Sequence, residues 1–249
     1  MTRFLSLPRV VLSGLLLLAL AAVPAHGPRA VAQDGGEPAP ISVDDFETYT
    51  VGTFPDEWVF VTRGEEITSY KEAEEPGETI EVREEDDNQF VRFVIENEAV
   101  RYTQRNGHDF DWSLERHPRI AWQWRALHLP EGASERGKND SGAALYITFG
   151  SDWLGRPKSI KYTYSTTLSV GTVVDFGPLK AIVVDSGTEP GMGTWKTTQR
   201  NVANDYRQVF GGDPPNRPVS ITLWSDSDTT HDLAKVDFDN IRLLPPYRR

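Results

Sequence analysis

The chain has 249 residues, with 37 acidic against 26 basic side chains, a net charge of −11 and no cysteine. The negative charge disfavours partners that are themselves negative, namely nucleic acid and anionic membrane surfaces, but it is compatible with cation binding. Thiol chemistry and disulfides are excluded, and the chain is long enough to fold on a buried core without them.

Residues 1–32 have the pattern of a secretory signal peptide. Arg3 and Arg9 precede an apolar run over residues 10–23, which is shorter than the ~20 residues that a membrane-spanning helix needs. Small residues at positions 30 and 32 fit cleavage before residue 33. An uncleaved anchor is the alternative. We expect export to the periplasm or the medium, with no membrane contact after cleavage.

The rest of the chain is expected to form one domain. Residues 33–40, rich in Gly, Pro and acid and without periodicity, predict a linker. Residues 41–245 have a length normal for a single all-β domain, and residues 246–249 form a short tail.

The first element, residues 41–61, and the last, residues 233–244, carry related motifs in which acids flank a phenylalanine. Such motifs at both ends are typical of jelly-roll sandwiches, in which the first and last strands lie side by side. Acids from the two strands would then meet, and we predict a structural calcium site there. Solvated charge on a sheet edge is the alternative. The candidate calcium ligands are Asp45, Glu47, Asp237 and Asp239.

Between these ends, short segments alternate in polarity or are rich in β-branched and aromatic residues, with Gly- and Pro-rich turns between them. This recurrence predicts an all-β fold, an antiparallel β-sandwich of jelly-roll form. The segments are residues 89–96, 99–104, 119–129, 143–150, 159–167, 181–186, 194–202 and 219–225.

Alternation also predicts which side chains face the core. The rows containing Trp122, Leu145, Tyr162 and Ile221 are assigned to it, with Val219 heading the last row. The opposite face of one sheet would then present a mixed group: Gln123, Arg125, Tyr146, Lys161, Thr163 and Trp224.

Such a face suits a sugar, because an aromatic ring stacks on the flat sugar and the hydroxyls need donors and acceptors. The alternative is that a further loop covers the face and that Tyr146 and Trp224 pack as ordinary buried rings.

Residues 204–212 are the one segment with a helical pattern. Tyr206, Val209 and Phe210 fall on one side, Asn204 would cap the start, and Gly211 or Gly212 would end the helix.

Residues 224–230, Trp-Ser-Asp-Ser-Asp-Thr-Thr, follow an apolar strand and match the D-x-D-x-T loop of haloacid-dehalogenase-like phosphatases. In those enzymes the loop follows the first strand of a parallel sheet with crossover helices. Here strands precede it and too little chain follows, so we reject a phosphatase. Three interpretations remain for Asp226 and Asp228: an ordinary turn, a cation site, or polar contacts to a ligand.

Other catalytic sets are poorly supported. The five histidines lack zinc-ligand spacing, and there is neither a G-x-S-x-G elbow nor the E-x-D-x-x-E motif of jelly-roll glucanases. A carboxylate pair assembled from distant loops, such as Asp140 with Asp205 or Asp226, remains open.

Several blocks, taken in order, resemble a bacterial family of exported proteins known as domain of unknown function 3047. They are WQWRALHLP, NDSGAALY, IKYTYS, RNVANDYRQVFG and LWSDSDTT followed by VDFDNIRL. The resemblance implies a single extracytoplasmic sandwich domain and no particular activity. By fold analogy the chain is also similar to many carbohydrate-binding modules, which does not establish function.

We therefore expect a secreted, non-catalytic module that binds a glycan-like ligand, with structural calcium as a further hypothesis. One alternative is a hydrolase or lyase that cleaves polysaccharide through paired acids, and another is a structural or adhesive envelope protein. The predicted ligand-binding residues are Gln123, Arg125, Asp140, Tyr146, Lys161, Trp224, Asp226 and Asp228.

Overall fold

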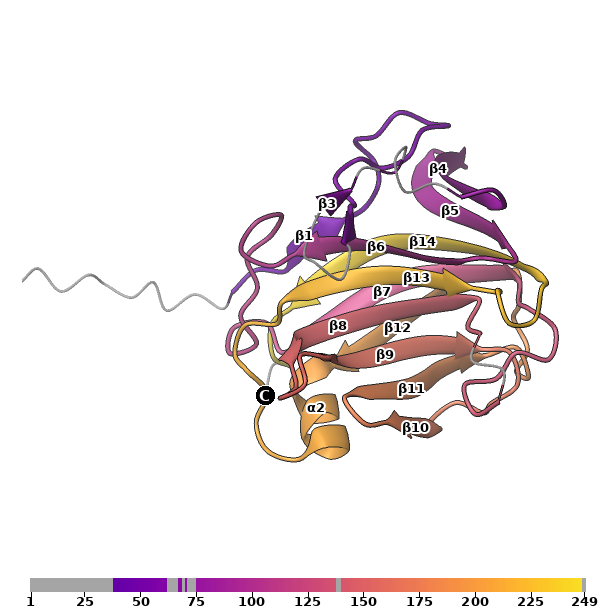
Figure 1. Ribbon diagram of the computed structural model, residues 1–249. Coiled ribbons are helices and arrows are strands. Elements are labelled where there is room, and N and C mark those ends of the chain that lie inside the picture. Colours follow the sequence, from indigo (N-terminus) through magenta and orange to yellow (C-terminus); the bar gives the residue numbers. More distant parts are fainter. Residues whose placement is uncertain (1–37, 62–66, 69, 71–74, 138–139, 248–249) are drawn as a thin grey trace, which may run out of the picture. The chain divides into compact units, whose positions relative to one another are not determined.

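A computed structural model of the chain describes residues 38–61, 67–68, 70, 75–137 and 140–247. These residues form mainly β-strands, arranged in two six-stranded sheets and a small two-stranded ribbon (Figure 1). Within them no helix is long and apolar enough to cross a membrane. The predicted signal peptide, residues 1–32, lies outside the described residues.

The first sheet, called sheet A, contains the two ends of the domain. Its strands, in order, are β12 (Lys196–Asn201), β7 (Arg119–His128), β14 (Leu233–Leu244), β5 (Asn88–Glu96) and β4 (Glu78–Glu85), with β1 (Ile41–Asp44) paired to β14. β1 and β14 run antiparallel, with Ile41 opposite Leu243. The expectation that the first and last strands lie side by side is confirmed.

The second sheet, called sheet B, is antiparallel with one exception. Its strands, in order, are β10 (Val173–Phe176), β11 (Leu179–Ser186), β9 (Pro157–Ser165), β8 (Ala143–Ser151), β13 (Ser220–Asp226) and β6 (Ala99–Arg105). β11 and β9 pair in parallel. The chain leaves β9, forms the edge strand β10, and turns back through a hairpin into the place beside β9.

The ribbon of β2 (Phe60–Val61) and β3 (Ile67–Thr68) extends sheet B. Val59, just before β2, bridges to Thr103 on β6.

The inner faces of the two sheets enclose a core rich in aromatic rings. Trp122 and Trp124 of sheet A contact each other edge to face. Trp122 packs on Tyr162 of sheet B, with ring centroids 5.5 Å apart, and Trp124 packs on Tyr164, with centroids 5.6 Å apart. Burial of each such ring stabilises the fold by roughly 1.5–3 kcal/mol or more. The predicted core rows are confirmed except for Val219, which is 48% exposed because it precedes β13.

The predicted helix exists but begins earlier than expected. Helix α2 spans Val202–Phe210, and its N-cap is Asn201, whose side chain accepts a hydrogen bond from the backbone N–H of Asn204 at 3.0 Å. Asn204 is therefore inside the helix and does not cap it. Gly211 ends the helix with φ 73°, a positive value that glycine adopts at little steric cost because it has no Cβ.

Candidate functional site

The predicted ligand-binding residues lie on two different sheets. Gln123 and Arg125 belong to β7 and face outward from sheet A, whereas Tyr146, Lys161 and Trp224 face outward from sheet B. The prediction that they share one face was wrong. Alternation assigns a side chain to a side of its strand, but it does not show which sheet that strand joins.

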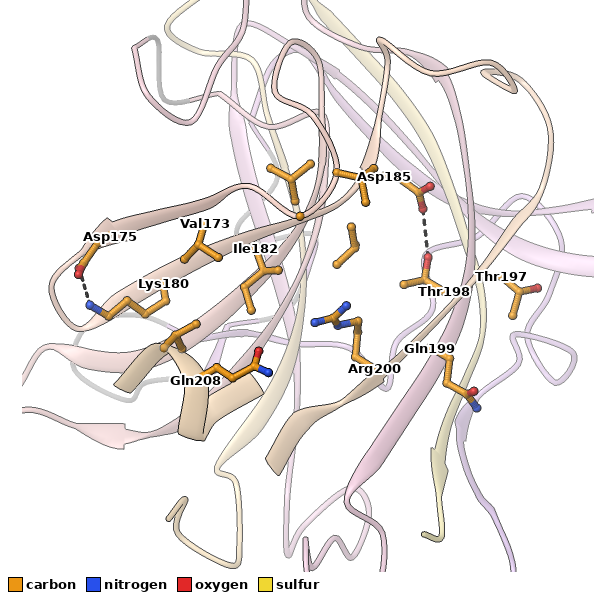
Figure 2. A pocket seen from close by; sticks show the side chains of 15 residues that line it. Val173, Asp175, Lys180, Ile182, Asp185, Thr197, Thr198, Gln199, Arg200 and Gln208 are labelled. Carbon is orange, nitrogen blue, oxygen red and sulfur yellow. Dashed lines mark hydrogen bonds and ion pairs between the residues drawn. The ribbon is translucent and has the colours of Figure 1, made fainter. Parts of the chain in front are cut away.

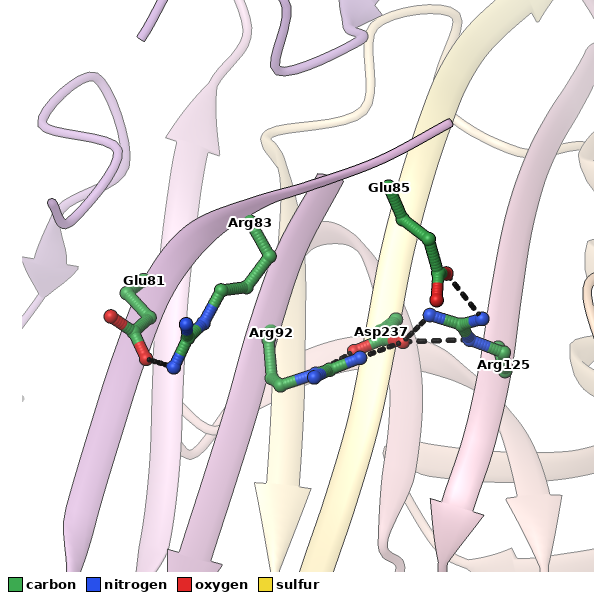
Figure 3. A network of polar contacts seen from close by, with 6 residues as sticks. All are labelled: Glu81, Arg83, Glu85, Arg92, Arg125 and Asp237. Carbon is green, nitrogen blue, oxygen red and sulfur yellow. Dashed lines mark hydrogen bonds and ion pairs between the residues drawn. The ribbon is translucent and has the colours of Figure 1, made fainter. Parts of the chain in front are cut away.

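On sheet A, Arg125 belongs to an ion-pair network centred on Asp237 (Figure 3). The Asp237 carboxylate is fully buried and accepts hydrogen bonds from both Arg92 and Arg125 at 2.7–2.9 Å. Glu85 pairs with the far side of the Arg125 guanidinium at 2.7 Å. Arg125 is thus held in the fold, and Asp237 is already paired with two cations.

The other predicted calcium ligands also have partners within the protein. The Asp45 carboxylate accepts a hydrogen bond from the backbone N–H of Glu47. The Glu47 carboxylate accepts one from the backbone N–H of Gln89 at 3.0 Å. Burial raises the pKa of Asp239, which accepts from two asparagine side chains. The four acids do not form a cluster; among the described residues, the carboxylates that meet are those of Asp140, Asp226 and Asp228.

Sequence reasoning missed Asp44, the buried acid at the end of β1. Its carboxylate accepts from Trp58 Nε1 at 2.7 Å, from Tyr49 Oη at 2.9 Å and from the backbone of Phe46 at 2.8 Å. Burial raises the pKa of Asp44, and these hydrogen bonds, which lower it, only partly offset the effect. Asp44 therefore holds the segment that follows β1, and only the bulge in the β1 pairing turns it inward.

On sheet B, three aromatic rings and two cations contact one another in a row across the outer face, called here the aromatic–cation row. The Arg101 guanidinium lies 5.1 Å from the Phe60 ring and 6.0 Å from the Trp224 ring. Trp224 and Tyr146 are 5.2 Å apart, and the Lys161 ammonium lies 5.6 Å from Tyr146. The three distances between a cation and a ring are within the range of cation–π attraction. Trp224 and Tyr146 are half-buried, and Lys161 is buried.

The loop before β8 covers one end of this face. Glu135, from that loop, is 1% exposed and accepts hydrogen bonds from Thr163 at 2.7 Å and Ser165 at 2.6 Å, both on β9. The covering loop envisaged as an alternative therefore exists over β9. Over β8 and β13 the rings of Tyr146 and Trp224 keep part of their surface exposed.

The Asp-rich segment after β13 is a turn capped by a distant acid. Asp140 accepts from the backbone and the hydroxyl of Thr230, both at 2.6 Å, and from the backbone of Thr229 at 3.2 Å. Burial alone would raise the pKa of Asp140, but these hydrogen bonds outweigh it and lower the pKa. β13 is antiparallel to both neighbours, which is not the strand arrangement of a haloacid-dehalogenase-like site.

Asp226, the last residue of β13, lies beside this turn and is 7% exposed. Its Oδ1 has no hydrogen-bond partner, and its Oδ2 has a long contact of 3.4 Å from Trp224 Nε1. Burial raises the pKa of Asp226 to about 7. The Lys161 charge and the backbone N–H of Asp228 oppose this shift, whereas the charges of Asp228 and Asp140 add to it.

Sheet B thus brings together six of the eight predicted ligand-binding residues. Asp205, the other acid considered as a partner for Asp140, lies elsewhere and bonds Arg200 and Tyr162. The six are Asp140, Tyr146, Lys161, Trp224, Asp226 and Asp228.

A groove of about 720 Å³ lies between strands β10 and β11 of sheet B, strand β12 of sheet A and helix α2 (Figure 2). Its charged groups have partners: Lys180 pairs with Asp175 at 2.5 Å, and Asp185 accepts from Thr198 at 3.1 Å. Sequence reasoning missed this groove because its walls come from strands of different sheets and from helix α2, which only the folded chain brings together.

The fold and these sites define a two-sheet β-sandwich with an aromatic–cation row on one outer face. The chain belongs to the family described as protein of unknown function (DUF3047), whose sequence profile matches residues 57–242. A comparison with curated proteins finds no match.

Solved structures similar to the chain include two carbohydrate-binding modules from Clostridium thermocellum. The family 11 module of the cellulosomal cellulase Lic26A-Cel5E has a TM-score of 0.44 and 10% identity, over 85% of this chain and 97% of that one. The family 30 module of the cellulosomal cellulase Cel9D-Cel44B has a TM-score of 0.40 and 9% identity, over 70% of this chain and 87% of that one.

A third is CBM27-1 of Caldicellulosiruptor saccharolyticus in complex with mannohexaose, with a TM-score of 0.38 and 11% identity, over 84% of this chain and 99% of that one. Similarity at this level carries no argument about the ligand of this chain.

Proposed function

We propose that the chain is an exported, non-catalytic module that binds a glycan at the aromatic–cation row of sheet B. The observation that carries the proposal is the Tyr146–Trp224 pair, two rings 5.2 Å apart on an outer face and still partly exposed. A sugar ring stacks on such a surface through its C–H groups. Export is supported by the signal-peptide pattern of residues 1–32.

The surroundings of the two rings are polar. Two hydroxyl pairs span the outer face, Thr103 with Thr222 at 2.8 Å and Thr148 with Ser159 at 2.9 Å. Thr103, Thr222 and Ser159 are buried, so these hydroxyl pairs join neighbouring strands beneath the rings. A face that combines partly exposed aromatic rings with cations fits a glycan better than an apolar ligand.

The test compares Trp224→Ala with Trp195→Ala in native affinity gels containing soluble β-glucan, mannan, pectin or alginate. Trp195 is also half-buried, but it packs on Phe90 on the outer side of sheet A. We expect Trp224→Ala to weaken glycan binding by ~2 kcal/mol, about 30-fold, because truncation of a binding anchor has that effect. Trp195→Ala should retain wild-type affinity.

Urea unfolding of both variants is measured first. A loss of ~3–5 kcal/mol in Trp224→Ala would mean that the ring belongs to the core. That result, or an equal loss of binding in both variants, would contradict the proposal.

Glycan cleavage is a second candidate function, favoured by the acids at the end of the row. Asp140 and Asp226 have carboxylate oxygens within 4.8 Å of each other, and the raised pKa of Asp226, about 7, suits a general acid. Retaining glycosidases place their two carboxyl groups ~5–5.5 Å apart. Release of reducing ends from the same polysaccharides by wild type, abolished in Asp226→Asn, would establish cleavage over simple binding.

A further inference from the structure

Three carboxylates meet where the loop before β8 touches the turn after β13. Asp140 comes from the loop, Asp226 ends β13, and Asp228 lies in the turn. One oxygen from each lies within 4.8 Å of the others. Like charges this close repel one another unless a proton or a cation lies between them.

Asp226 differs from the other buried acids that the structure describes. Those acids each accept hydrogen bonds with both oxygens or from several donors, as Glu135 does from three hydroxyls and Asp237 from two guanidinium groups. Asp226 is 7% exposed and its Oδ1 has no partner. A buried carboxylate oxygen without a donor is costly, so it is rare unless something else occupies the site.

We propose that Asp140, Asp226 and Asp228 bind one divalent cation of the calcium type. All three ligands are hard oxygens on loop or strand-end positions, the donor type that Ca²⁺ prefers. Ca²⁺ takes six to eight oxygens in irregular geometry, so backbone carbonyls and water would complete the shell. This site differs from the one predicted at Asp45 and Asp237, and it does not depend on a glycan ligand. It is an alternative to the cleavage mechanism above, because a carboxylate that binds a cation is ionised and cannot serve as the general acid.

The local charge balance supports a cation of charge +2. Lys161 is the nearby ammonium, and the acid that acts on it most strongly is Glu135, ahead of Asp226 and Asp140. The three carboxyl groups together therefore carry more negative charge than this one ammonium balances, in a partly buried place. A bound cation would also fasten the loop to the turn that Asp140 already caps.

Terbium luminescence tests the site directly, because Tb³⁺ has the ligand preferences of Ca²⁺ and is sensitised by a nearby tryptophan. Trp224 Nε1 lies 3.4 Å from Asp226 Oδ2. The full chain, freed of metal with a chelator that is then removed, should show one saturable Tb³⁺ signal that Ca²⁺ displaces. At about a hundred times the Kd, Ca²⁺ should raise the Tm by about 5–10 °C relative to chelator.

Three variants make the test specific. Asp228→Asn, at an exposed position, should weaken Tb³⁺ binding at least tenfold, whereas Asp213→Asn, which removes an exposed acid elsewhere, should not change it. Trp224→Phe should lose the sensitised luminescence but keep the Tm shift. The proposal is overturned by the absence of saturable Tb³⁺ binding, by equal Tm values in Ca²⁺ and chelator, or by equal binding in Asp228→Asn and wild type.

Discussion

The aspartates of this chain differ in what surrounds each carboxylate, and the nearby sequence does not show the difference. Asp237 lies in a predicted strand and Asp226 in the turn predicted after one, and both were candidates for metal or ligand binding. Yet Asp237 is held between two guanidinium groups, one of them 145 positions away along the chain, while Asp226 keeps an oxygen without a donor. The sequence marked both as candidate ligands, but it did not show what each carboxylate meets.

The Asp237 network supplies a test at this scale. In Asp237→Asn, Arg92 loses its carboxylate partner in a largely buried place and Arg125 keeps only Glu85, so we expect a loss of about 3 kcal/mol in the free energy of unfolding. Asp213→Asn breaks an exposed ion pair with Arg207 and should lose less than about 1 kcal/mol. Urea midpoints measure the stability of both variants. If both lose less than about 1 kcal/mol, the buried ion pairs of Asp237 stabilise the fold no more than an exposed pair does.

At the scale of elements, the strands with aromatic or β-branched alternation were predicted and the charged or short ones were not. β4 was missed because Glu81, Arg83 and Glu85 alternate with Ile80 and Val82, and this density of charge resembles a solvated segment. β10 has only four residues. The helix start was placed too late because Asn201 and Asn204 are both good capping residues, and only the strand before α2 decides between them.

The hairpin of β4 and β5 depends on a glycine that precedes it. Gly77 has φ +101°, and its carbonyl oxygen accepts from the backbone of Glu96 at 2.9 Å. A Cβ at this position would overlap the carbonyl oxygen of Glu96. We therefore expect Gly77→Ala to lower the free energy of unfolding by roughly 2 kcal/mol, from backbone strain and the displaced hairpin.

The matched control is Gly137→Ala, where a Cβ meets nothing within 4 Å and φ is outside the left-handed region. Thermal unfolding of this variant should be unchanged or slightly raised, since alanine restricts the unfolded chain. If Gly77→Ala unfolds at the wild-type temperature, the hairpin tolerates a side chain there and the close approach is not essential.

At the scale of the whole molecule, the sandwich class and the closure of the first strand on the last were predictable, but the strand order was not. The paired motifs at the two ends indicated that β1 and β14 are neighbours, and the structure confirms it. Nothing local shows that β14 also lies between β7 and β5, because strand order follows from pairings between distant segments. For the same reason the two faces of the predicted site could not be told apart.

The place of β14 leads to a prediction about the whole fold. β14 pairs with β7, β5 and β1, and it buries a row of apolar side chains completely. Without it, β5 and β4 lose their connection to the rest of sheet A. A chain that ends at residue 232 should therefore show no cooperative urea transition in tryptophan fluorescence and should lose the near-ultraviolet signal of its packed rings. The buried row is Ala234, Val236, Phe238, Ile241 and Leu243.

A chain that ends at residue 245 is the control for this truncation. It loses Tyr247, which is 65% exposed and contacts Arg119 and Gln199, so the expected loss is less than about 1 kcal/mol and the transition stays cooperative. If the chain ending at residue 232 unfolds cooperatively near the wild-type midpoint, sheet A closes without β14. The last strand would then be an addition to a fold that the earlier strands complete. We expect the opposite, because both flanking strands depend on β14 for their hydrogen-bond partners on that side.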